Sequence, residues 1–225
     1  MGSFETNKNI WCDIYKSGES NLSYPNENLV RYLHYLFSRQ DLSKLKVLDY
    51  GFGSGNNLLH LYKMGIDVSG VEISEQAKNI SLTKLGQGFN QEKLFLMNKE
   101  GIIPFTLGSF DLVIAWQVLY YNSYESLVNV LSMINRLLKP GGKFVGTMIR
   151  KEDYAVANSD TTSGYERVMN AAMGNQCGSI IQVLPAEDDI RKTFCVFDNI
   201  QIGYMTTKMN NVVSSHWIIS GDKYK

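Results

Sequence analysis

Three glycines and an acidic residue form the clearest chemical signal in the chain. Gly51, Gly53 and Gly55 lie in the stretch VLDYGFGSGNNLLHL, residues 47–61, directly behind an apolar run that contains Asp49. Glycines let a loop turn tightly and bring backbone N–H groups against a ligand. In a dinucleotide-binding fingerprint the third glycine follows the second by three positions, whereas Gly55 follows Gly53 by two. The spacing disfavours a pyrophosphate ligand and, with it, a nicotinamide-dependent oxidoreductase.

Two carboxylates narrow the ligand further. Asp49 would repel a phosphate brought to the glycine loop and would attract an ammonium group. Glu72 stands at the end of the next apolar run, where its carboxylate oxygens can accept hydrogen bonds from ribose hydroxyls. An adenosine that carries a cationic amino-acid tail would satisfy both acids.

Strands and helices that alternate along the chain must position these residues. Apolar runs of strand length predict strands at 46–51, 66–74, 93–98, 109–121 and 143–150. Helical periodicity between them predicts helices at 55–65, 74–86 and 124–142. Such alternation specifies an α/β fold: a doubly wound, Rossmann-like sheet, mostly parallel, with helices on both faces.

The remaining segments flank this core, and we expect one domain of 225 residues. An N-terminal cover, 1–44, reads as a loop followed by a helix around Leu29 and Leu33. The core spans 45–150. Residues 151–184 are polar and predict an irregular substrate lid with a short helix around 165–173. Residues 185–225 predict a helix and an antiparallel hairpin that turns at Asn210.

Four motifs in order resemble those of class I S-adenosylmethionine-dependent methyltransferases of the small-molecule type. They are VLDYGFGSGNNLLHL, VSGVEIS, IIPFTLGSFDLVIAWQVLYY and RLLKPGGKFVGT, which together cover about residues 45–150. The resemblance implies a seven-stranded sheet whose last strand is antiparallel, with S-adenosylmethionine as the cofactor and S-adenosylhomocysteine as the product. It also implies that Asp49 and the glycine loop hold the methionine part and that Glu72 binds the ribose.

The other cofactor contacts follow from the same resemblance. Members of the family often carry an acidic residue where this chain has Asn98 and Lys99, so we expect the adenine amino group to meet Asn98 or a backbone carbonyl. Aromatic residues of the N-terminal cover close the pocket in many small-molecule members. The expected cofactor-binding residues are Tyr15, Tyr24, Asp49, Gly51, Gly53, Gly55, Asn56, Glu72, Ile73, Asn98, Lys99, Trp116 and Gln117.

The methyl acceptor is less clearly indicated. Methyl transfer from a sulfonium works largely by alignment and exclusion of water, so no catalytic residue is obligatory. An alcohol acceptor requires a general base, and the candidates are Tyr120, Tyr121 and His216; packing at a strand end and a core histidine are the structural alternatives. We expect O-methylation of a sugar, a phosphorylated intermediate or another metabolite. A non-catalytic binding subunit and an N-methyltransferase acting on a small amine or a macromolecule are the alternatives.

Composition excludes several other functions. The 22 basic and 22 acidic residues balance, and the end of the fourth predicted strand lacks the Asn/Asp-Pro-Pro-Tyr element of base methyltransferases, so we expect no nucleic-acid partner. No apolar stretch reaches the length of a membrane span. Three cysteines without CxxC spacing predict free thiols in the cytoplasm and no metal site. The sequence leaves a monomer and a homodimer equally open.

Overall fold

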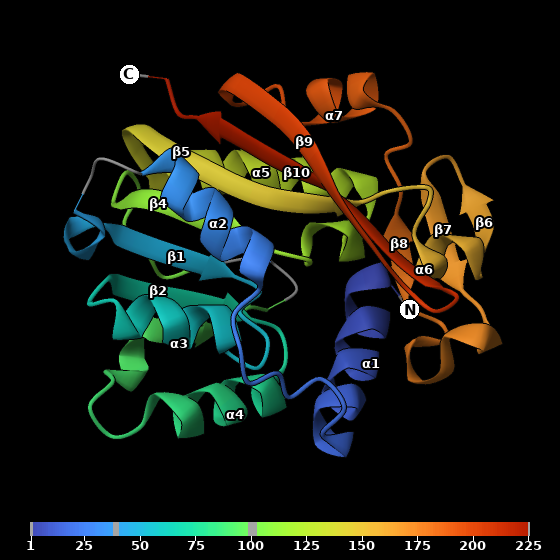
Figure 1. Ribbon diagram of the computed structural model, residues 1–225, viewed down its shortest axis with the longest axis horizontal. Helices are drawn as coiled ribbons and strands as arrows, with labels where there is room; N and C mark the ends of the chain where they lie inside the picture. The colour runs from blue at the N-terminus through green and yellow to red at the C-terminus, as the bar shows by residue number, and fades with distance from the viewer. Residues whose placement is uncertain (1, 38–40, 99–102, 225) are drawn as a thin grey trace.

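A seven-stranded sheet forms the centre of the molecule. We describe residues 2–37, 41–98 and 103–224 of a computed structural model (Figure 1). The strand order is β3-β2-β1-β4-β5-β10-β9. The strands are β1 (Lys46–Tyr50), β2 (Asp67–Glu72), β3 (Leu94–Leu96), β4 (Phe110–Ala115), β5 (Leu138–Ile149), β9 (Asp198–Met209) and β10 (Val212–Asp222). Pairings among β1 to β5 are parallel, and β10 runs antiparallel to both β5 and β9, which confirms the expected mixed sheet.

Helices cover both faces of this sheet because its central strands are apolar on both sides. Val47 of β1 packs in a core cluster with α2 and α3, whereas its neighbour Leu48 packs in a second cluster with α5 and α7. Alternate residues of a strand point to opposite faces, so each face needs its own cover. The covering helices are α2 (Glu27–Leu36), α3 (Asn56–Lys63), α4 (Glu75–Leu85), α5 (Tyr124–Leu137) and α7 (Glu187–Thr193).

The N-terminal cover contains a helix that the sequence interpretation missed. Helix α1 spans Ser3–Ser17 and includes the stretch from Ile10 that was expected to be a loop. It ends at Gly18, whose φ of 83° is the left-handed conformation of a helix C-terminus. The arrowheads of β1 and β2 point toward this helix (Figure 1). Helix α1 therefore lies at the carboxyl edge of the sheet, where parallel α/β folds bind ligands.

The insert 151–184 is also more regular than expected. It contains α6 (Tyr154–Ala157), the turn η4 (Ala171–Gln176) and a three-stranded antiparallel sheet of β6 (Ser159–Ser163), β7 (Glu166–Met169) and β8 (Ile180–Gln182). The predicted short helix at 165–173 is wrong, because β7 occupies residues 166–169 as the middle strand and the turn η4 begins at Ala171. Tertiary contacts outweigh the local helix preference here. Strand β7 is paired on both sides, Met169 is buried, and Arg167 donates hydrogen bonds to Ser159.

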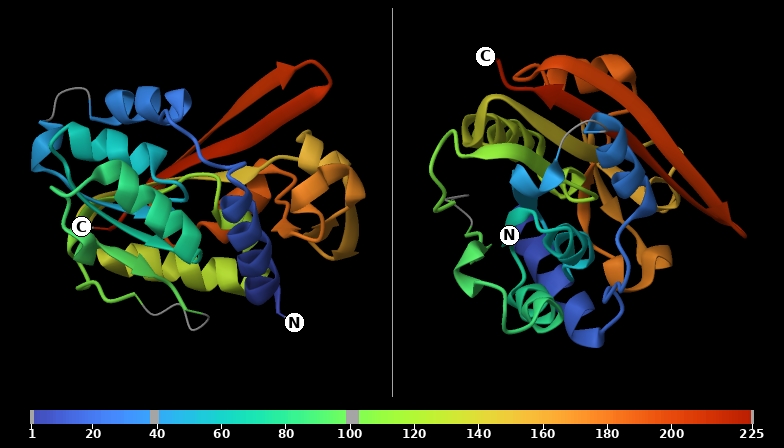
Figure 2. Two further views of the ribbon diagram at one scale, coloured as in Figure 1. Left: turned by 90° about the horizontal axis from the view of Figure 1, so that it is seen from below. Right: turned by 60° about the vertical axis from the view of Figure 1, so that its left-hand side comes forward.

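The C-terminal prediction is confirmed. Helix α7 precedes a long hairpin of β9 and β10 that turns at Asn210, whose φ of 53° suits a tight turn. The tip of this hairpin extends beyond the rest of the sheet (Figure 2). None of the described helices has the length and apolar character needed to cross a lipid bilayer.

Candidate active site

The glycine loop connects β1 to α3 at the carboxyl edge of the sheet. Gly51 and Gly53 adopt φ values of 75° and 54°, in the left-handed region that favours glycine. A Cβ atom at Gly51 would lie 2.3 Å from Val118, and one at Gly53 would lie 2.6 Å from the hydroxyl of Tyr15. Side chains from the segment after β4 and from the cover therefore lie against the loop, which leaves no room for larger residues.

Glu72 shapes this loop before it can bind anything else. Its Oε2 accepts a hydrogen bond from the N–H of Gly53 at 2.9 Å, and its Oε1 accepts from Ile73 at 2.8 Å and Ser74 at 3.1 Å. Burial raises the pKa of Glu72, and these three bonds oppose the rise. A carboxylate has about four acceptor positions, so about one remains, on Oε2. The three bonds therefore leave Glu72 about one acceptor position for the predicted ribose contact.

Asp49 is the most isolated acid of the site. Its side chain is 2% exposed, and its Oδ2 has no hydrogen-bond partner among the described residues. Burial, followed by the nearby charge of Glu72, raises the pKa of Asp49 to about 7. An unpaired buried carboxylate is unfavourable. A cation brought next to Asp49 would relieve this cost.

Two connected cavities lie beside the loop. The inner cavity and its open mouth together hold about 620 Å³ of space free of protein atoms. Its walls are mostly aromatic and polar, formed by Phe4, Asn7, Trp11, Tyr15, Tyr50, Gly51, Glu72, Ile73, Met97, Gln117, Val118, Tyr121 and Asn122. The outer cavity shares Trp11, Tyr15, Gly51 and Gln117 with it. Asp49 is absent from the described lining of both and lies behind the wall.

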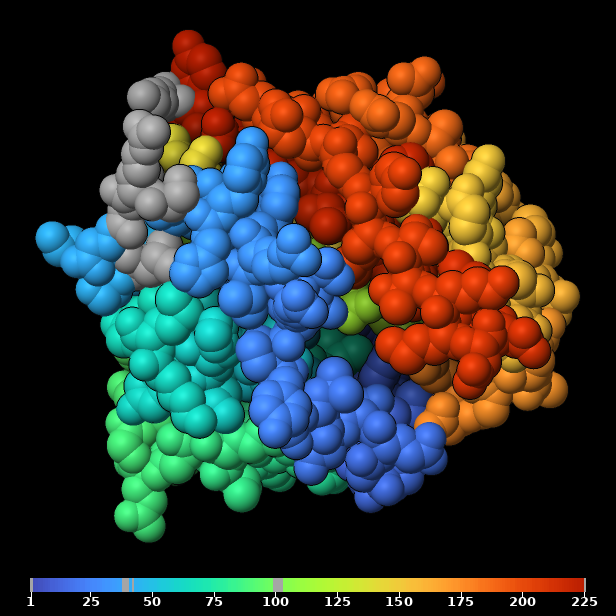
Figure 3. Space-filling model, in the orientation of Figure 1, coloured from blue at the N-terminus to red at the C-terminus, as the bar shows by residue number. Residues whose placement is uncertain are grey.

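The outer cavity opens to solvent. Besides the four shared residues, it is lined by Ser20, Leu22, Tyr24, Pro25, Asn26, Glu27, Phe52, Gly53, Ser54, Asn56, Asn57 and Trp116. A hollow is visible on this side of the molecule between the N-terminal segment and the β9–β10 hairpin (Figure 3). The outer cavity therefore connects the glycine loop to solvent.

Aromatic residues of α1 close the inner cavity. Trp11 packs edge-on against Tyr121 with ring centroids 5.2 Å apart, and Tyr15 lies 5.7 Å from Trp11. Burial, followed by the charges of Glu72 and Tyr121, raises the pKa of Tyr15 well above its ordinary value. The structure thus brings Tyr15 to the predicted position over the loop.

Asn7 is the residue of this closure that sequence reasoning missed. Its Nδ2 donates to the carbonyls of Tyr121 at 2.7 Å and Ile180 at 2.9 Å, and its Oδ1 accepts from the N–H of Ile180 at 2.8 Å. Asn7 is 1% exposed. It joins α1 to both the segment after β4 and the insert. Its partner Ile180 is far away in sequence, so no local signal could have revealed the role.

The other predicted contacts divide into two groups. Ile73, Gln117 and Trp116 line the cavities, and Asn98 lines a neighbouring hollow beside Met97. Asn56 instead donates to the carbonyl of Tyr24 at 2.8 Å, and the Tyr24 ring is 83% exposed at the outer cavity. These two residues fasten the cover to the loop. Lys99 lies outside the described residues.

Gln117 adopts an uncommon backbone conformation. Its φ is 55°, and its N–H donates to Oγ1 of Thr147 at 2.7 Å. A residue other than glycine at positive φ persists only where its surroundings hold it. Because Gln117 lines both cavities, the strained residue stands where they join.

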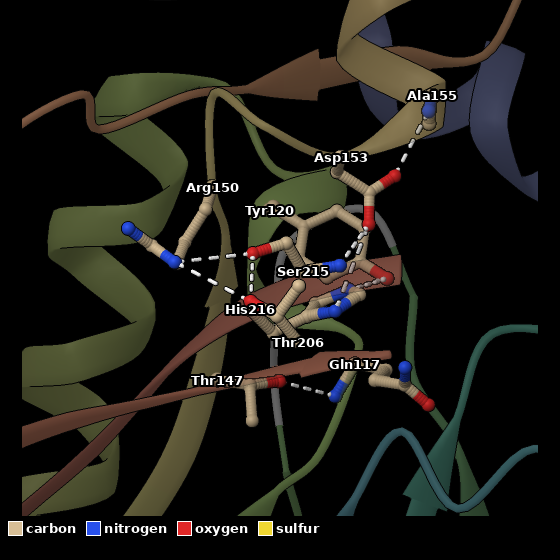
Figure 4. A network of polar contacts seen from close by, with 9 residues as sticks. All are labelled: Gln117, Tyr120, Thr147, Arg150, Asp153, Ala155, Thr206, Ser215 and His216. Atoms are coloured by element: carbon tan, nitrogen blue, oxygen red, sulfur yellow. Dashed lines mark hydrogen bonds and ion pairs between the residues drawn. The ribbon is translucent and has the colours of Figure 1, made fainter. Parts of the chain in front are cut away.

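Two of the predicted catalytic residues, Tyr120 and His216, form a buried polar cluster with Asp153 (Figure 4), and the third, Tyr121, adjoins it. Tyr121 lines the inner cavity and is hydrogen-bonded to Tyr120. The Tyr120 hydroxyl lies 3.4 Å from Nε2 of His216, whose Nδ1 lies 3.8 Å from Oδ2 of Asp153. Burial lowers the pKa of His216 to about 4, so the imidazole is neutral at pH 7. Of these four residues, Tyr121 is the only one among the described residues that line the two cavities.

Comparison with known proteins agrees with this geometry. Residues 22–188, more than half of the chain, match a family described as the methyltransferase domain. The chain belongs to this family. This confirms the resemblance to class I S-adenosylmethionine-dependent methyltransferases and the expected cofactor.

Individual relatives of the methyltransferase domain differ in what their names state. An uncharacterized methyltransferase of Alkaliphilus oremlandii is 26% identical over 82% of this chain and 78% of its own. A ubiquinone biosynthesis O-methyltransferase of Thiobacillus denitrificans is 29% identical over 49% of this chain and 47% of its own. The chain thus spans less than half of this second relative's length.

Solved structures show the same fold at low identity. A 1,6-didemethyltoxoflavin-N1-methyltransferase of Burkholderia thailandensis superposes with a TM-score of 0.67 at 13% identity, over 98% of this chain and 88% of its own. A methyltransferase of Methanosarcina mazei gives 0.65 at 18% identity, over 89% of this chain and 99% of its own.

The residues of the site fit the cofactor of this family. The unpartnered Oδ2 of Asp49 and the remaining acceptor position of Glu72 suit an ammonium and a ribose hydroxyl. The rings of Trp11, Tyr15 and Tyr121 suit a sulfonium cation. The particular contacts stay predictions.

Proposed function

We propose that this methyltransferase transfers the methyl group of S-adenosylmethionine to an oxygen atom of a small molecule. The observation that carries the proposal is Glu72: a buried carboxylate on the cavity wall that holds the glycine loop and keeps about one acceptor position. Alignment and exclusion of water are the main requirements of methyl transfer. The cavity behind α1, which the side chains of α1 partly cover, would provide both.

The residues of the site divide the work of binding. Glu72 would accept a hydrogen bond from the ribose, and Asp49 would compensate the ammonium group. When bound, the cofactor supplies a methyl group already activated by its sulfonium. Trp11 and Tyr15 exclude water from that end of the cavity and present their rings to the cation.

The polar cluster behind Tyr121 supports oxygen as the methylated atom. A hydroxyl acceptor must lose its proton when the O–CH₃ bond forms and the S–CH₃ bond breaks. Tyr121 reaches the cavity wall, and Tyr120 links it to the neutral imidazole of His216. Asp153 stands where it would stabilise an imidazolium. These groups would carry the proton away from the acceptor, without placing a charged base in the cavity.

Substitution of Glu72 tests the cofactor site. We expect Glu72→Gln to weaken S-adenosylhomocysteine binding by about 10- to 100-fold, because a charge-assisted hydrogen bond and the loop anchor are lost. Glu75→Gln is the matched control, since Glu75 is exposed in the first turn of α4. Calorimetry measures both, with thermal unfolding of the ligand-free proteins as a folding check. Equal affinities in the two variants would contradict the proposed site.

Turnover separates this proposal from a non-catalytic binding subunit. Labelled S-adenosylmethionine incubated with a metabolite extract should yield a labelled small molecule in the presence of the wild-type protein. A subunit that only binds the cofactor would bind S-adenosylhomocysteine normally and label nothing.

A further inference from the structure

The walls of both cavities carry little charge. Glu72 and Glu27 are acidic lining residues, and no Lys, Arg or His lines either cavity in the ranges that the structure describes. Two cationic side chains, Lys84 and Arg31, lie close to the outer cavity but interact with other groups of the protein. Lys84 donates to two backbone carbonyls, and Arg31 lies 3.7 Å from Glu27 with both side chains largely exposed and screened by water.

Among the described residues, the charge balance inside the site leaves no place for an anionic acceptor. Asp49 and Glu72 are both buried acids. S-adenosylmethionine brings two positive groups, a sulfonium and an ammonium, and one carboxylate, so these acids and that carboxylate already outnumber its positive groups by one. A phosphate or carboxylate on the acceptor would add a buried negative charge without a cationic partner, which is strongly unfavourable.

The same walls offer aromatic surfaces and neutral donors. Trp116 lines the outer cavity, and Trp11 lines both cavities. Gln117 adds an amide at the junction of the cavities, and the exposed Tyr24 ring stands at the opening. Rings and uncharged donors recognise flat or ring-shaped molecules through stacking and through bonds to hydroxyl or carbonyl oxygens.

We propose that the methyl acceptor is an uncharged ring compound that enters through the outer cavity, and that phosphorylated and carboxylated metabolites are rejected. This inference rests on the proposed methyl transfer and narrows its acceptor. Of the acceptors expected from the sequence, it retains neutral sugars and other neutral metabolites. It removes phosphorylated intermediates.

Fractionation of an extract tests the charge of the acceptor without knowing its identity. A small-metabolite extract of the source cells is passed over an anion-exchange resin, and both fractions are incubated with the protein and labelled S-adenosylmethionine. We expect label in the unretained fraction to exceed that in the eluted fraction by about tenfold or more, as rejection of one uncompensated charge implies. Predominant labelling of the eluted fraction would overturn the inference while upholding methyl transfer. Absence of label in both fractions would overturn methyl transfer itself.

A pair of variants tests the route through the outer cavity. Tyr24→Ala removes an exposed ring from its opening, and Tyr35→Ala removes a similarly exposed ring of α2 that lines neither cavity among the described residues. At saturating S-adenosylmethionine, we expect Tyr24→Ala to lower labelling of the unretained fraction by about fivefold, as loss of one stacking contact implies. Tyr35→Ala should match the wild type. Equal labelling by both variants would contradict entrance of the acceptor past Tyr24.

Discussion

At the scale of single residues, the two acids of the site have different tasks. Glu72 accepts three hydrogen bonds from backbone N–H groups of the glycine loop and of the segment after β2. It therefore holds the loop in place as well as offering an acceptor to the cofactor. Asp49 lacks a partner for Oδ2 and stands behind the wall. A buried acid without a partner lowers the stability of the ligand-free protein. Its cost is recovered only when a cation is bound.

Replacement of Asp49 should therefore stabilise the ligand-free protein at alkaline pH. The pKa of Asp49 is about 7 in the fold and 3.8 when unfolded, so its contribution to stability is full below pH 4 and lost as pH rises through about 7. At pH 8, we expect Asp49→Asn to raise the free energy of unfolding by on the order of 2 kcal/mol and to flatten its dependence on pH. Urea unfolding at several pH values measures both, with the exposed Asp13→Asn as control. A less stable variant at pH 8 would refute this reading of Asp49.

At the scale of elements, α1 acts as a bridge between the core and the insert. Asn7 supplies both connections through three hydrogen bonds to main-chain groups, and Glu19, just beyond the helix, is hydrogen-bonded to Asn175 of the turn η4. The insert therefore contacts the cover as well as the sheet. Closure over the cofactor depends on both segments together.

Loss of the Asn7 side-chain amide should loosen this bridge. We expect Asn7→Leu to destabilise the protein by about 2–4 kcal/mol, because the buried N–H of Ile180 and the two carbonyls lose their partners. Limited proteolysis should cut α1 sooner in the variant, while the remaining core stays resistant. Unchanged cleavage of α1 would show that its aromatic packing alone holds it.

At the scale of the whole molecule, His216 connects three regions that are distant in sequence. It belongs to β10, lies beside Tyr120 after β4 and faces Asp153 at the start of the insert. Its pKa of about 4 is below the unfolded value of 6.5, so the unfolded chain takes up a proton first and stability falls as pH drops from about 6.5 to 4. Between these pH values the folded protein keeps His216 neutral, which lowers its free energy of unfolding.

Substitution by a neutral side chain should remove that part of the acid sensitivity. We expect His216→Gln to lose less stability than the wild type between pH 6.5 and pH 4, by on the order of 2 kcal/mol, although it starts from a lower value at pH 7. Thermal unfolding across this range compares the two proteins. Parallel pH profiles would contradict a buried, neutral His216.

The sequence predicts much of the fold but little of how α1 and the insert pack over the cavity. Apolar runs and helical periodicity locate the core strands and helices, because each face of a parallel sheet must be covered. The roles of Asn7 and of β7 depend on partners that are distant along the chain or on neighbouring strands. The sequence predicts that Glu72 contacts the ribose of the cofactor. It does not predict the bonds of Glu72 to Gly53 and Ser74, because these depend on the folded loop.

The position of Asn7 also sets an order of assembly. Its partner Ile180 lies 173 residues later, so α1 leaves the ribosome long before the surface on which it docks exists. Contacts that close such a long loop form late, because their entropy cost must be met by structure already present. During synthesis the bonds between Asn7 and Ile180 can therefore form only after the insert has emerged, although α1 also packs against Tyr121, which emerges earlier. The connection between the cover and the insert is thus a late step in folding.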